Sequence, residues 1–384
     1  MPTHVRFIPA FAACTLLAGC PGEVPTLPAG LSLTAGKQIP VGQTPHGMAA
    51  AAGFVYNANV GDGTISVIDA ATDTVVKTLP IENGIPGYLK AFHDEQHLMA
   101  LDTKQGRLLV LDARDQQVLQ TVALGHGPDK IVVSDDDRQV LVTLTGEPKL
   151  VALTFGEDRA QPPSRKDFAI GTVAGAEGGH GHRAVGFAAG WAVTPSSGEN
   201  EVQLVDLAAG TVKTVADGNE PAPVAIGTRD GSAVVAIVGN KASNTVTLYD
   251  LPTGEKTTLS GVGLAPTEIG VDAALGRAYV SMAGSNEVLA IDYLGKRVLG
   301  RIGVGQRPVH VYMAPSTPAT GAHRVWVGND DGASVSVIDG QTLAVLATVA
   351  TGEGHHKMAF SGDKAYVSNI RVHTVSVIDR TSIR

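Results

Sequence analysis

A short apolar run that ends in Asp and is followed by a turn recurs eight times along this chain of 384 residues. Successive copies lie 43, 42, 52, 44, 42, 47 and 40 residues apart, and the third ends in Thr154 instead of Asp. A period of about 40 to 50 residues built from short strands is typical of a β-propeller with one four-stranded blade per repeat. The pattern therefore predicts an all-β propeller. The copies are Thr64–Asp69, Leu108–Asp112, Leu150–Thr154, Val202–Asp206, Val246–Asp250, Val288–Asp292, Val335–Asp339 and Val375–Asp379.

The two ends of the repeat array predict how the ring closes. The last repeat stops at Arg384, just after its third strand, so its outer strand is missing. The segment 37–42 near the N-terminus is similar to the other outer strands, such as 118–125. An N-terminal strand that completes the last blade would leave no open sheet edge. We expect a single propeller domain over 37–384 with eight blades, or seven if the weak fourth segment, 160–182, does not form one.

Composition argues against some classes of partner. The formal net charge is −8 and only 4% of the residues are aromatic. An acidic surface repels phosphate backbones, and few aromatic side chains are present for bases to stack on. Nucleic acid is therefore not an expected partner. The sequence also lacks Cys-x-x-Cys-His, Gly-x-Ser-x-Gly and the phosphate-binding loop motif.

The first residues have the features of an export signal. Arg6 precedes an apolar stretch, 7–17, that is too short to cross a bilayer as a mature helix. The stretch ends in Leu17-Ala18-Gly19-Cys20, which resembles a bacterial lipobox. The resemblance implies a signal peptide over 1–19 and acyl chains on Cys20 that anchor the protein to a membrane. Residues 20–36 would be the acylated Cys and a tether, and the protein would lie on the extracytoplasmic side of a bacterial cell envelope.

Each blade has a corner where its innermost strand begins, and this corner faces the central channel. Aligning the repeats on the Pro at that corner selects one residue per blade. The fourth and eighth repeats lack the Pro, so their alignment rests on spacing and is uncertain by one residue. The selected residues are His46, Gly87, Asp129, His182, Ala222, Thr267, Val309 and His356, and the next residues are Gly47, Tyr88, Lys130, Arg183, Pro223, Glu268, His310 and Lys357.

Histidine is concentrated at these corners. Of the 12 histidines, seven lie in the corner segments: His46, His126, His180, His182, His310, His355 and His356. Neutral imidazole is the commonest metal ligand near neutral pH, and three His with a water or carboxylate is a recognised zinc arrangement. We therefore expect zinc or copper at the channel, with ligands drawn from His46, His182, His356, His310, His355, His180 and Asp129. Met48 and Met358, each two residues beyond a corner His, would favour copper if they face the metal, although Met there is more often core packing.

Two other kinds of function compete with metal binding. A lactone hydrolase would use His310 as general base, Glu268 as acid and Arg183 to support an oxyanion. Alternatively, the corners hold no ligand and the propeller presents its loops to a protein partner in the envelope. A charged set at the corners, Lys130, Arg183, Glu268, Lys357 and Arg307, is either an anion pocket or a solvated rim.

The repeats resemble the YVTN-type propeller family. The motif is visible in Val55-Tyr56-Asn57-Ala58-Asn59, in Ala278-Tyr279-Val280-Ser281 and in Ala365-Tyr366-Val367-Ser368-Asn369. The resemblance covers 37–384 and implies the fold, but the family includes surface proteins, lactonases and redox domains. Eight blades are also similar to the haem d1 propellers of nitrite reductases, which implies His as an axial ligand. The placement of His46, His182 and His356 is loosely similar to periplasmic propellers that carry zinc.

Overall fold

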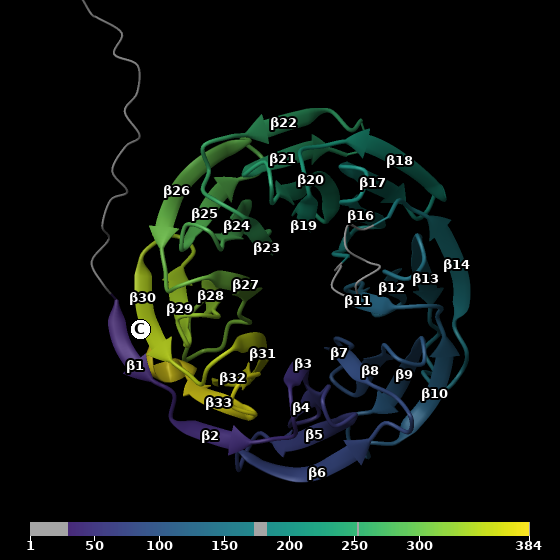
Figure 1. Ribbon diagram of the computed structural model, residues 1–384, viewed down its shortest axis with the longest axis vertical. Helices are drawn as coiled ribbons and strands as arrows, with labels where there is room; N and C mark the ends of the chain where they lie inside the picture. Colours follow the sequence, from purple (N-terminus) through teal and green to yellow (C-terminus); the bar gives the residue numbers. More distant parts are fainter. Residues whose placement is uncertain (1–29, 173–182, 252, 384) are drawn as a thin grey trace, which may run out of the picture.

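The chain folds into a closed ring of eight blades around a central channel (Figure 1). The computed structural model describes residues 30–172, 183–251 and 253–383. In this part of the chain every blade is an antiparallel sheet whose strands run in chain order from the channel to the rim, apart from two N-terminal strands that join the outside of the last two blades. The predicted all-β propeller with eight blades is confirmed, and the fourth repeat does form a blade.

The first four blades follow the chain from the N-terminal side. Their strands, from the inner to the outer position, are β3 (Pro45–Ala51), β4 (Phe54–Asn59), β5 (Thr64–Asp69) and β6 (Thr74–Pro80) in blade one; β7 (Pro86–Ala91), β8 (His97–Asp102), β9 (Arg107–Asp112) and β10 (Val118–Ala123) in blade two; β11 (Pro128–Val133), β12 (Gln139–Leu144), β13 (Lys149–Thr154) and β14 (Ser164–Ala169) in blade three; and β15 (Gly186–Ala188), β16 (Trp191–Ser196), β17 (Glu201–Asp206) and β18 (Thr211–Ala216) in blade four.

The last four blades complete the circle. Their strands are β19 (Pro221–Arg229), β20 (Ser232–Asn240), β21 (Thr245–Asp250) and β22 (Lys256–Leu259) in blade five; β23 (Pro266–Asp272), β24 (Arg277–Met282), β25 (Glu287–Asp292) and β26 (Arg297–Gly303) in blade six; β27 (Pro308–Met313), β28 (Arg324–Asn329), β29 (Ser334–Asp339) and β30 (Val345–Ala350) in blade seven; and β31 (His355–Ser361), β32 (Lys364–Asn369) and β33 (Thr374–Asp379) in blade eight, followed by the short 3-10 helix η2 (Arg380–Ser382).

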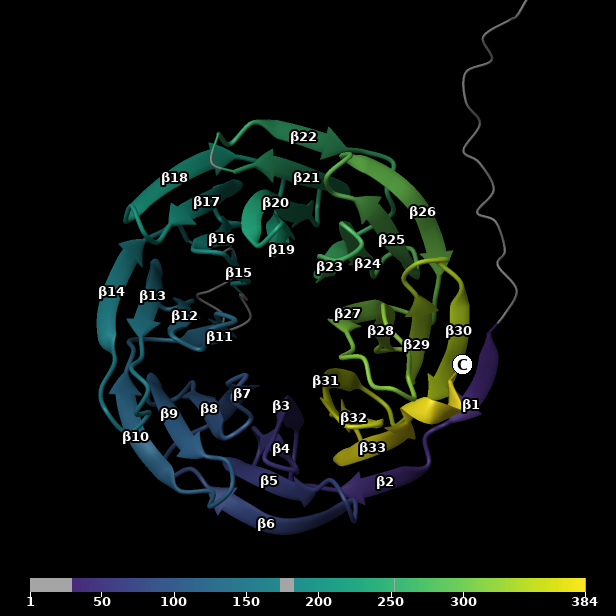
Figure 2. The ribbon, with the colours of Figure 1, turned by 180° about the vertical axis from the view of Figure 1, so that it is seen from behind.

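Two strands before blade one close the ring. β2 (Lys37–Pro40) pairs antiparallel with β33, with Ile39 opposite Val375, and becomes the fourth strand of blade eight. The predicted closure is therefore confirmed. β1 (Leu31–Thr34), which was not predicted, pairs parallel with β30 and adds a fifth strand to the outside of blade seven. Figure 2 shows both strands wrapped around the rim of the last two blades.

The core is a ring of clusters between neighbouring blades. Each of the eight buried apolar clusters takes side chains from two adjacent blades, for example Ile39, Val55 and Tyr366 at the junction of blades eight and one. Both faces of a middle strand are covered, so strands such as β4 and β32 are buried almost end to end. Because this packing lies between the blades, the channel wall is left to other side chains. No helix in the described ranges is long and apolar enough to cross a membrane.

Polar side chains set the turns within the blades. The Asp that ends the third strand caps the turn as the repeat predicts: Asp69 Oδ1 accepts hydrogen bonds from the backbone of Ala71 at 2.9 Å and Thr72 at 2.8 Å. At the end of the second strand, a buried Asn joins the next strand. Asn329 Nδ2 donates to the hydroxyls of Ser334 at 3.1 Å and Ser336 at 3.0 Å. Asn59 and Asn240 make the equivalent bonds in blades one and five.

Candidate functional site at the channel mouth

Strand register identifies the inner residue of each blade independently of the Pro alignment. In blade eight Tyr366, the third residue of β32, pairs with Ala359, and three residues before Ala359 stands His356. The same count in blade one leads from the Tyr56–Ala49 pair to His46. The predicted inner residue is thus reproduced in blade one, which has the Pro, and in blade eight, where His355 takes the place that Pro holds in most other blades.

Blade four differs from the alignment by one residue. Gly186 pairs with Val193, the third residue of β16, and counting back three residues gives Arg183 instead of His182. Without a Pro at this corner, spacing alone could not determine the register. His180 and His182, both predicted metal ligands, lie outside the described residues. Their role stays a prediction.

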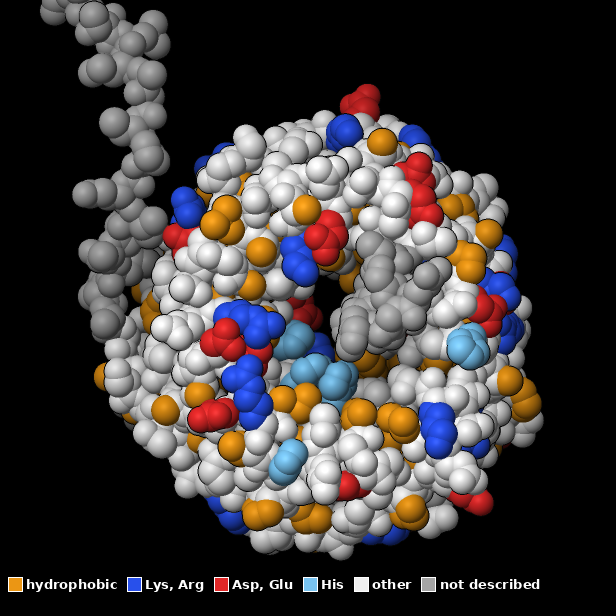
Figure 3. All heavy atoms as spheres, in the orientation of Figure 1, with side chains coloured by type: hydrophobic (Ala, Val, Ile, Leu, Met, Phe, Trp, Pro, Cys, Tyr) orange, Lys and Arg blue, Asp and Glu red, His pale blue; other side chains and the backbone are white. Residues whose placement is uncertain are grey.

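Three of the predicted histidines come together from adjacent blades. The ring of His356 lies 3.6 Å from that of His46 and 5.4 Å from that of His310, measured between centroids. They come from blades eight, one and seven. In the space-filling view, histidine side chains gather beside the central opening, over the ends of β27, β31 and β3 (Figure 3). The structure thus brings together three of the corner histidines that the sequence predicts as metal ligands.

His46 is held in one tautomer by the neighbouring blade. Its Nδ1 lies 2.8 Å from the carbonyl oxygen of Gly87. A carbonyl only accepts, so Nδ1 carries the hydrogen and the lone pair is on Nε2. Fixing one ring nitrogen to a carbonyl is how proteins orient a metal-ligating imidazole. The edge of Tyr88 also packs against this ring, with centroids 5.1 Å apart.

His310 is oriented in the same way by a carboxylate. Its Nδ1 hydrogen-bonds to Glu268 Oε2, and Lys357 Nζ lies 3.3 Å from the same nitrogen and 4.0 Å from the carboxylate. Burial and the charge of Lys357 lower the pKa of His310 to about 4, although Glu268 opposes them. Burial disfavours ionisation of Glu268, but Lys357 and His310 outweigh it and lower its pKa to about 2. At neutral pH the pair is therefore a neutral imidazole donating to a carboxylate, with the lone pair on Nε2.

His355 is more deeply buried than His46, His310 and His356. Its side chain is 2% exposed and packs against Gly328 of blade seven, where a Cβ would overlap the imidazole ring. Neither ring nitrogen has a hydrogen-bond partner among the described residues, and burial lowers the pKa of His355 well below its usual value. Its ring centroid lies 5.7 Å from that of His310, and its role as a metal ligand stays a prediction. Met48 and Met358 are likewise buried in apolar clusters between blades.

A second polar group continues the wall from blade two to blade four. Lys130 Nζ donates to the hydroxyl of Tyr88 and lies 4.1 Å from the centre of its ring. Asp129 Oδ2 accepts a hydrogen bond from the backbone of Arg183 at 2.6 Å. Burial lowers the pKa of Arg183 to about 10, and its guanidinium donates to the carbonyl of Gly171 at 2.5 Å. Arg307, predicted to border the channel, instead pairs with Asp330 and Asp331.

The described histidines are close but not arranged around a common centre. Two imidazoles on one tetrahedral zinc have ring centroids about 5 Å apart, given zinc–nitrogen bonds of about 2.0–2.1 Å. The separation of His310 and His356 fits this value, whereas His46 and His356 are stacked too closely. Among the residues described, no group of three or more His, Cys, Asp or Glu side chains is placed to hold a metal ion. A shared ion would require the His46 and His356 rings to separate.

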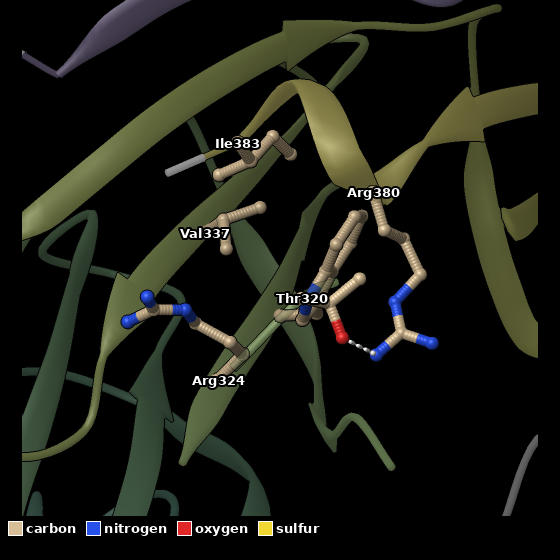
Figure 4. Close-up of a pocket in the computed structure, with 6 residues that line it drawn as sticks. Thr320, Arg324, Val337, Arg380 and Ile383 are labelled. Atoms are coloured by element: carbon tan, nitrogen blue, oxygen red, sulfur yellow. Dashed lines mark hydrogen bonds between the residues drawn. The ribbon is translucent and has the colours of Figure 1, made fainter. Parts of the chain in front are cut away.

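A small cavity far from the channel has a structural explanation. It lies under the C-terminal turn and is lined by Thr320, Arg324, Trp326, Val337, Arg380 and Ile383 (Figure 4). Arg380 is 2% exposed and donates to the hydroxyl of Thr320 at 3.2 Å and to the carbonyl of Gly362 at 2.7 Å. These bonds fasten the last turn to the loop between β27 and β28 of blade seven and to the turn between β31 and β32 of blade eight. The cavity is a gap in this packing.

Comparison with known proteins supports the fold and leaves the function open. No protein-family model and no curated protein matches the sequence. Among solved structures, the dihydro-haem d1 dehydrogenase NirN in complex with DHE superposes with a TM-score of 0.62 and 16% identity, over 88% of this chain and 69% of that chain. Sqt1 from Saccharomyces cerevisiae superposes with a TM-score of 0.71 and 9% identity, over 91% of this chain and 99% of that chain. At these identities the likeness is one of architecture.

Proposed function

We propose that the protein binds a transition metal ion, zinc or copper, at the channel mouth and holds it without turning over a substrate. The observation that carries the proposal is the paired orientation of His46 and His310. Each has its Nδ1 hydrogen-bonded, one to a carbonyl and the other to a carboxylate, so that each lone pair is on Nε2. Packing alone does not require two imidazoles to have their Nδ1 atoms hydrogen-bonded so that both lone pairs are on Nε2.

The third described ligand would be His356. Its Nδ1 is buried and has no hydrogen-bond partner among the described residues. A buried nitrogen without a partner is costly unless something else satisfies it. Rotation of the rings of His46 and His356 away from each other would let both bind the same ion as His310. His180 or His182, from outside the described residues, would then be the candidates for a fourth ligand.

Elemental analysis of untagged protein tests the proposal. We expect about one equivalent of zinc or copper after loading and desalting. His46→Ala combined with His356→Ala should abolish retention. Val309→Ala is the matched control, because Val309 holds the same inner position in blade seven but has no donor atom. No retained metal, or equal retention by the double variant, would overturn the proposal.

A haem-type tetrapyrrole is the second candidate. The likeness to the NirN structure, solved with its ligand DHE, favours it. A tetrapyrrole supplies most of the ligands to its own iron, so one or two axial imidazoles suffice and a group of three is not needed. His46 or His310 would be the axial ligand. Visible absorption of the purified protein, or of protein incubated with haem, distinguishes this candidate from a bare ion.

Lactone hydrolysis is favoured by one contact only. His310 and Glu268 form the base–carboxylate pair that a hydrolase uses to orient an imidazole. Arg183, the predicted oxyanion support, belongs to blade four and makes its described side-chain hydrogen bond to Gly171. Hydrolysis of simple lactones that is lost in His310→Ala would favour this activity over metal storage.

We further propose that Cys20 anchors the protein to a membrane of the bacterial cell envelope, on the extracytoplasmic side. The lipobox-like Leu17-Ala18-Gly19-Cys20 supports this proposal, and all four residues lie outside the described part of the chain. Mass spectrometry of the N-terminal peptide tests it: acyl chains on Cys20 are expected. An unmodified Cys20 in the membrane fraction would contradict the anchor.

A further inference from the structure

Blade seven differs from the other blades at its outer edge. Among the described strands it is the one blade with five, because β1 lies outside β30 (Figure 2). The four residues of β1 pair in parallel with β30, from Leu31 opposite Ala347 to Thr34 opposite Ala350. The ring does not need this strand, since β2 closes it at blade eight. The extra strand therefore requires another explanation.

The outer strands differ in how their free edges are protected. Such an edge carries backbone N–H and C=O groups without strand partners, and it can pair with another chain unless a charged side chain, a cover or a short length prevents it. The outer strands β2, β6, β14, β18, β22 and β26 each contain a lysine or an arginine. By contrast, β10 and β30 contain no charged residue. These two edges need a different protection.

One position on the outer strands shows this difference most clearly, and it pairs with the fourth residue of the third strand. In blades one, three, four and eight it holds an exposed lysine: Lys77, Lys166, Lys213 and Lys37. In blade two it holds Gln120, whose amide donates to the carbonyl of Gln161 at 2.8 Å in a loop from blade three. In blade seven it holds Ala347, which is fully buried and lies opposite Leu31 of β1. Each uncharged edge is thus contacted by another segment of the chain.

β1 fits closely against β30 but is held by few contacts. A Cβ on Gly30 would lie 2.4 Å from the carbonyl oxygen of Val345, so only glycine lets the chain approach this closely. Leu33 is partly buried against the cluster between blades seven and eight, whereas the other three residues of β1 are exposed. β1 is itself uncharged, but its four residues offer a shorter edge than the six of β30. A very short edge strand is a poor template for pairing.

We propose that the edge of β30 is a self-association surface and that β1 keeps it closed. When β1 detaches, the edge of β30 pairs with the same edge of a second copy. A two-fold axis makes the two strands antiparallel, so the contact is self-complementary and ends at a dimer. No charged side chain within either strand opposes this pairing. The proposal is independent of the metal site, so its failure would leave the proposed function untouched.

Sedimentation velocity of the full chain in reducing buffer tests the proposal. Gly30→Val with Leu33→Asp should detach β1, because a side chain then meets the backbone of β30 and a charge replaces an apolar contact. We expect the wild type to stay monomeric and the double variant to approach the mass of a dimer as its concentration rises. Hydrogen exchange of residues 345–350 at low concentration should become at least about tenfold faster. Val76→Asp, at an exposed position of β6, is the matched control and should stay monomeric.

A lysine placed in β30 should reverse the association. Ala347→Lys, added to the double variant, gives blade seven the charge that blade one has at Lys77, and Thr348→Lys adds a charge while Ala347 is kept. Both should restore the monomer. A double variant that is monomeric at every concentration would overturn the proposal, as would a dimer that both lysine variants leave intact. Exchange that stays slow would also contradict it, because β1 would then not be what covers the edge. Association that accompanies a lost melting transition would come from unfolding and would count against the proposal.

Discussion

The inner walls of blades eight and one differ from that of blade five, although all three are built on the same strand register. Blades eight and one present His356 and His46 at the inner position, whereas blade five presents Ala222, followed by Pro223. Around the ring this position also holds Gly, Asp, Arg, Thr and Val. A position that accepts such different side chains is not determined by the needs of the fold.

In a repeated structure, functional residues are expected at positions that differ from blade to blade. Core positions are alike from blade to blade: Tyr56, Tyr279 and Tyr366 occupy the same place in their second strands and are all fully buried. The inner position varies freely, so the two histidines that occupy it on neighbouring blades, His46 and His356, have no packing explanation. The contrast predicts that the two kinds of position respond differently to substitution.

The largest expected effect comes from a substitution in β2, the strand that closes the ring. Ile39 on β2 is 3% exposed and packs between blades eight and one. Ile39→Asp places a charge in this core and should cost about 4 kcal/mol of unfolding free energy. Metal retention should fall with it, because blade eight carries His356. Leu31→Asp on β1, where the side chain is 52% exposed, should have little effect in urea unfolding. Equal losses in both variants would contradict the role of β2 as the closing strand.

The next effect is an acid-dependent loss of stability in the metal-free protein. The pKa of His310 is about 4 in the fold against a usual 6.5, in a site that also contains Glu268, Lys357, Lys130, His355 and His356. The unfolded chain binds the proton first, so stability is complete above pH 6.5 and falls as the pH drops towards 4. His310 contributes up to about 3 kcal/mol to this loss. The lowered pKa of Glu268, about 2, adds its own loss only below pH 4.5.

Urea unfolding at several pH values checks this dependence. His310→Gln should flatten the decline between pH 6.5 and 4.5, where Glu268 does not yet titrate. His93→Gln is a suitable comparison, because the side chain of His93 is 50% exposed and lies away from the channel. A wild-type stability that stays level over this range would be inconsistent with a buried neutral His310.

Removing two ligands should change metal affinity far more than stability. His46→Ala with His310→Ala should weaken zinc binding at least about 100-fold, since two prepared imidazoles are lost. Competition with a chromophoric zinc chelator measures the affinity. The unfolding free energy at pH 8 should fall by less than about 2 kcal/mol, although the side chain of His310 is only 15% exposed. A large loss of stability with unchanged affinity would identify the histidines as packing residues.

The smallest expected effect comes from the reverse substitution, which places a histidine at the inner position of blade five. Ala222→His gives blade five the residue that blades one and eight carry. We expect a change in unfolding free energy below about 1 kcal/mol and no change in zinc affinity. A strongly destabilised variant would show that the inner position is constrained by the fold after all.

The architecture could be predicted from the sequence because the same pattern of strands recurs in every blade. The Asp-terminated third strands, the closing strand β2 and the inner positions of the blades marked by Pro were all predicted correctly. β1 was missed because a parallel strand added outside blade seven belongs to no repeat. The corner of blade four was placed one residue early because no Pro marks it.

The sequence predicted which residues come together at the site, but not how their side chains are arranged. The approach of His46, His310 and His356 followed from the order of the blades, whereas the burial of His355 depends on Gly328 in the preceding blade. The bond between His310 and Glu268, which crosses from blade seven to blade six, had no signal in local spacing. Contacts between blades depend on side-chain direction, which the repeat pattern does not contain.

X-ray absorption at the zinc edge of the loaded protein shows directly whether the channel histidines bind the metal. We expect three imidazole nitrogens at about 2.0–2.1 Å from the zinc, and one fewer in His46→Ala. A spectrum with oxygen ligands alone, or one that is identical in wild type and His46→Ala, would contradict a metal site built from the channel histidines.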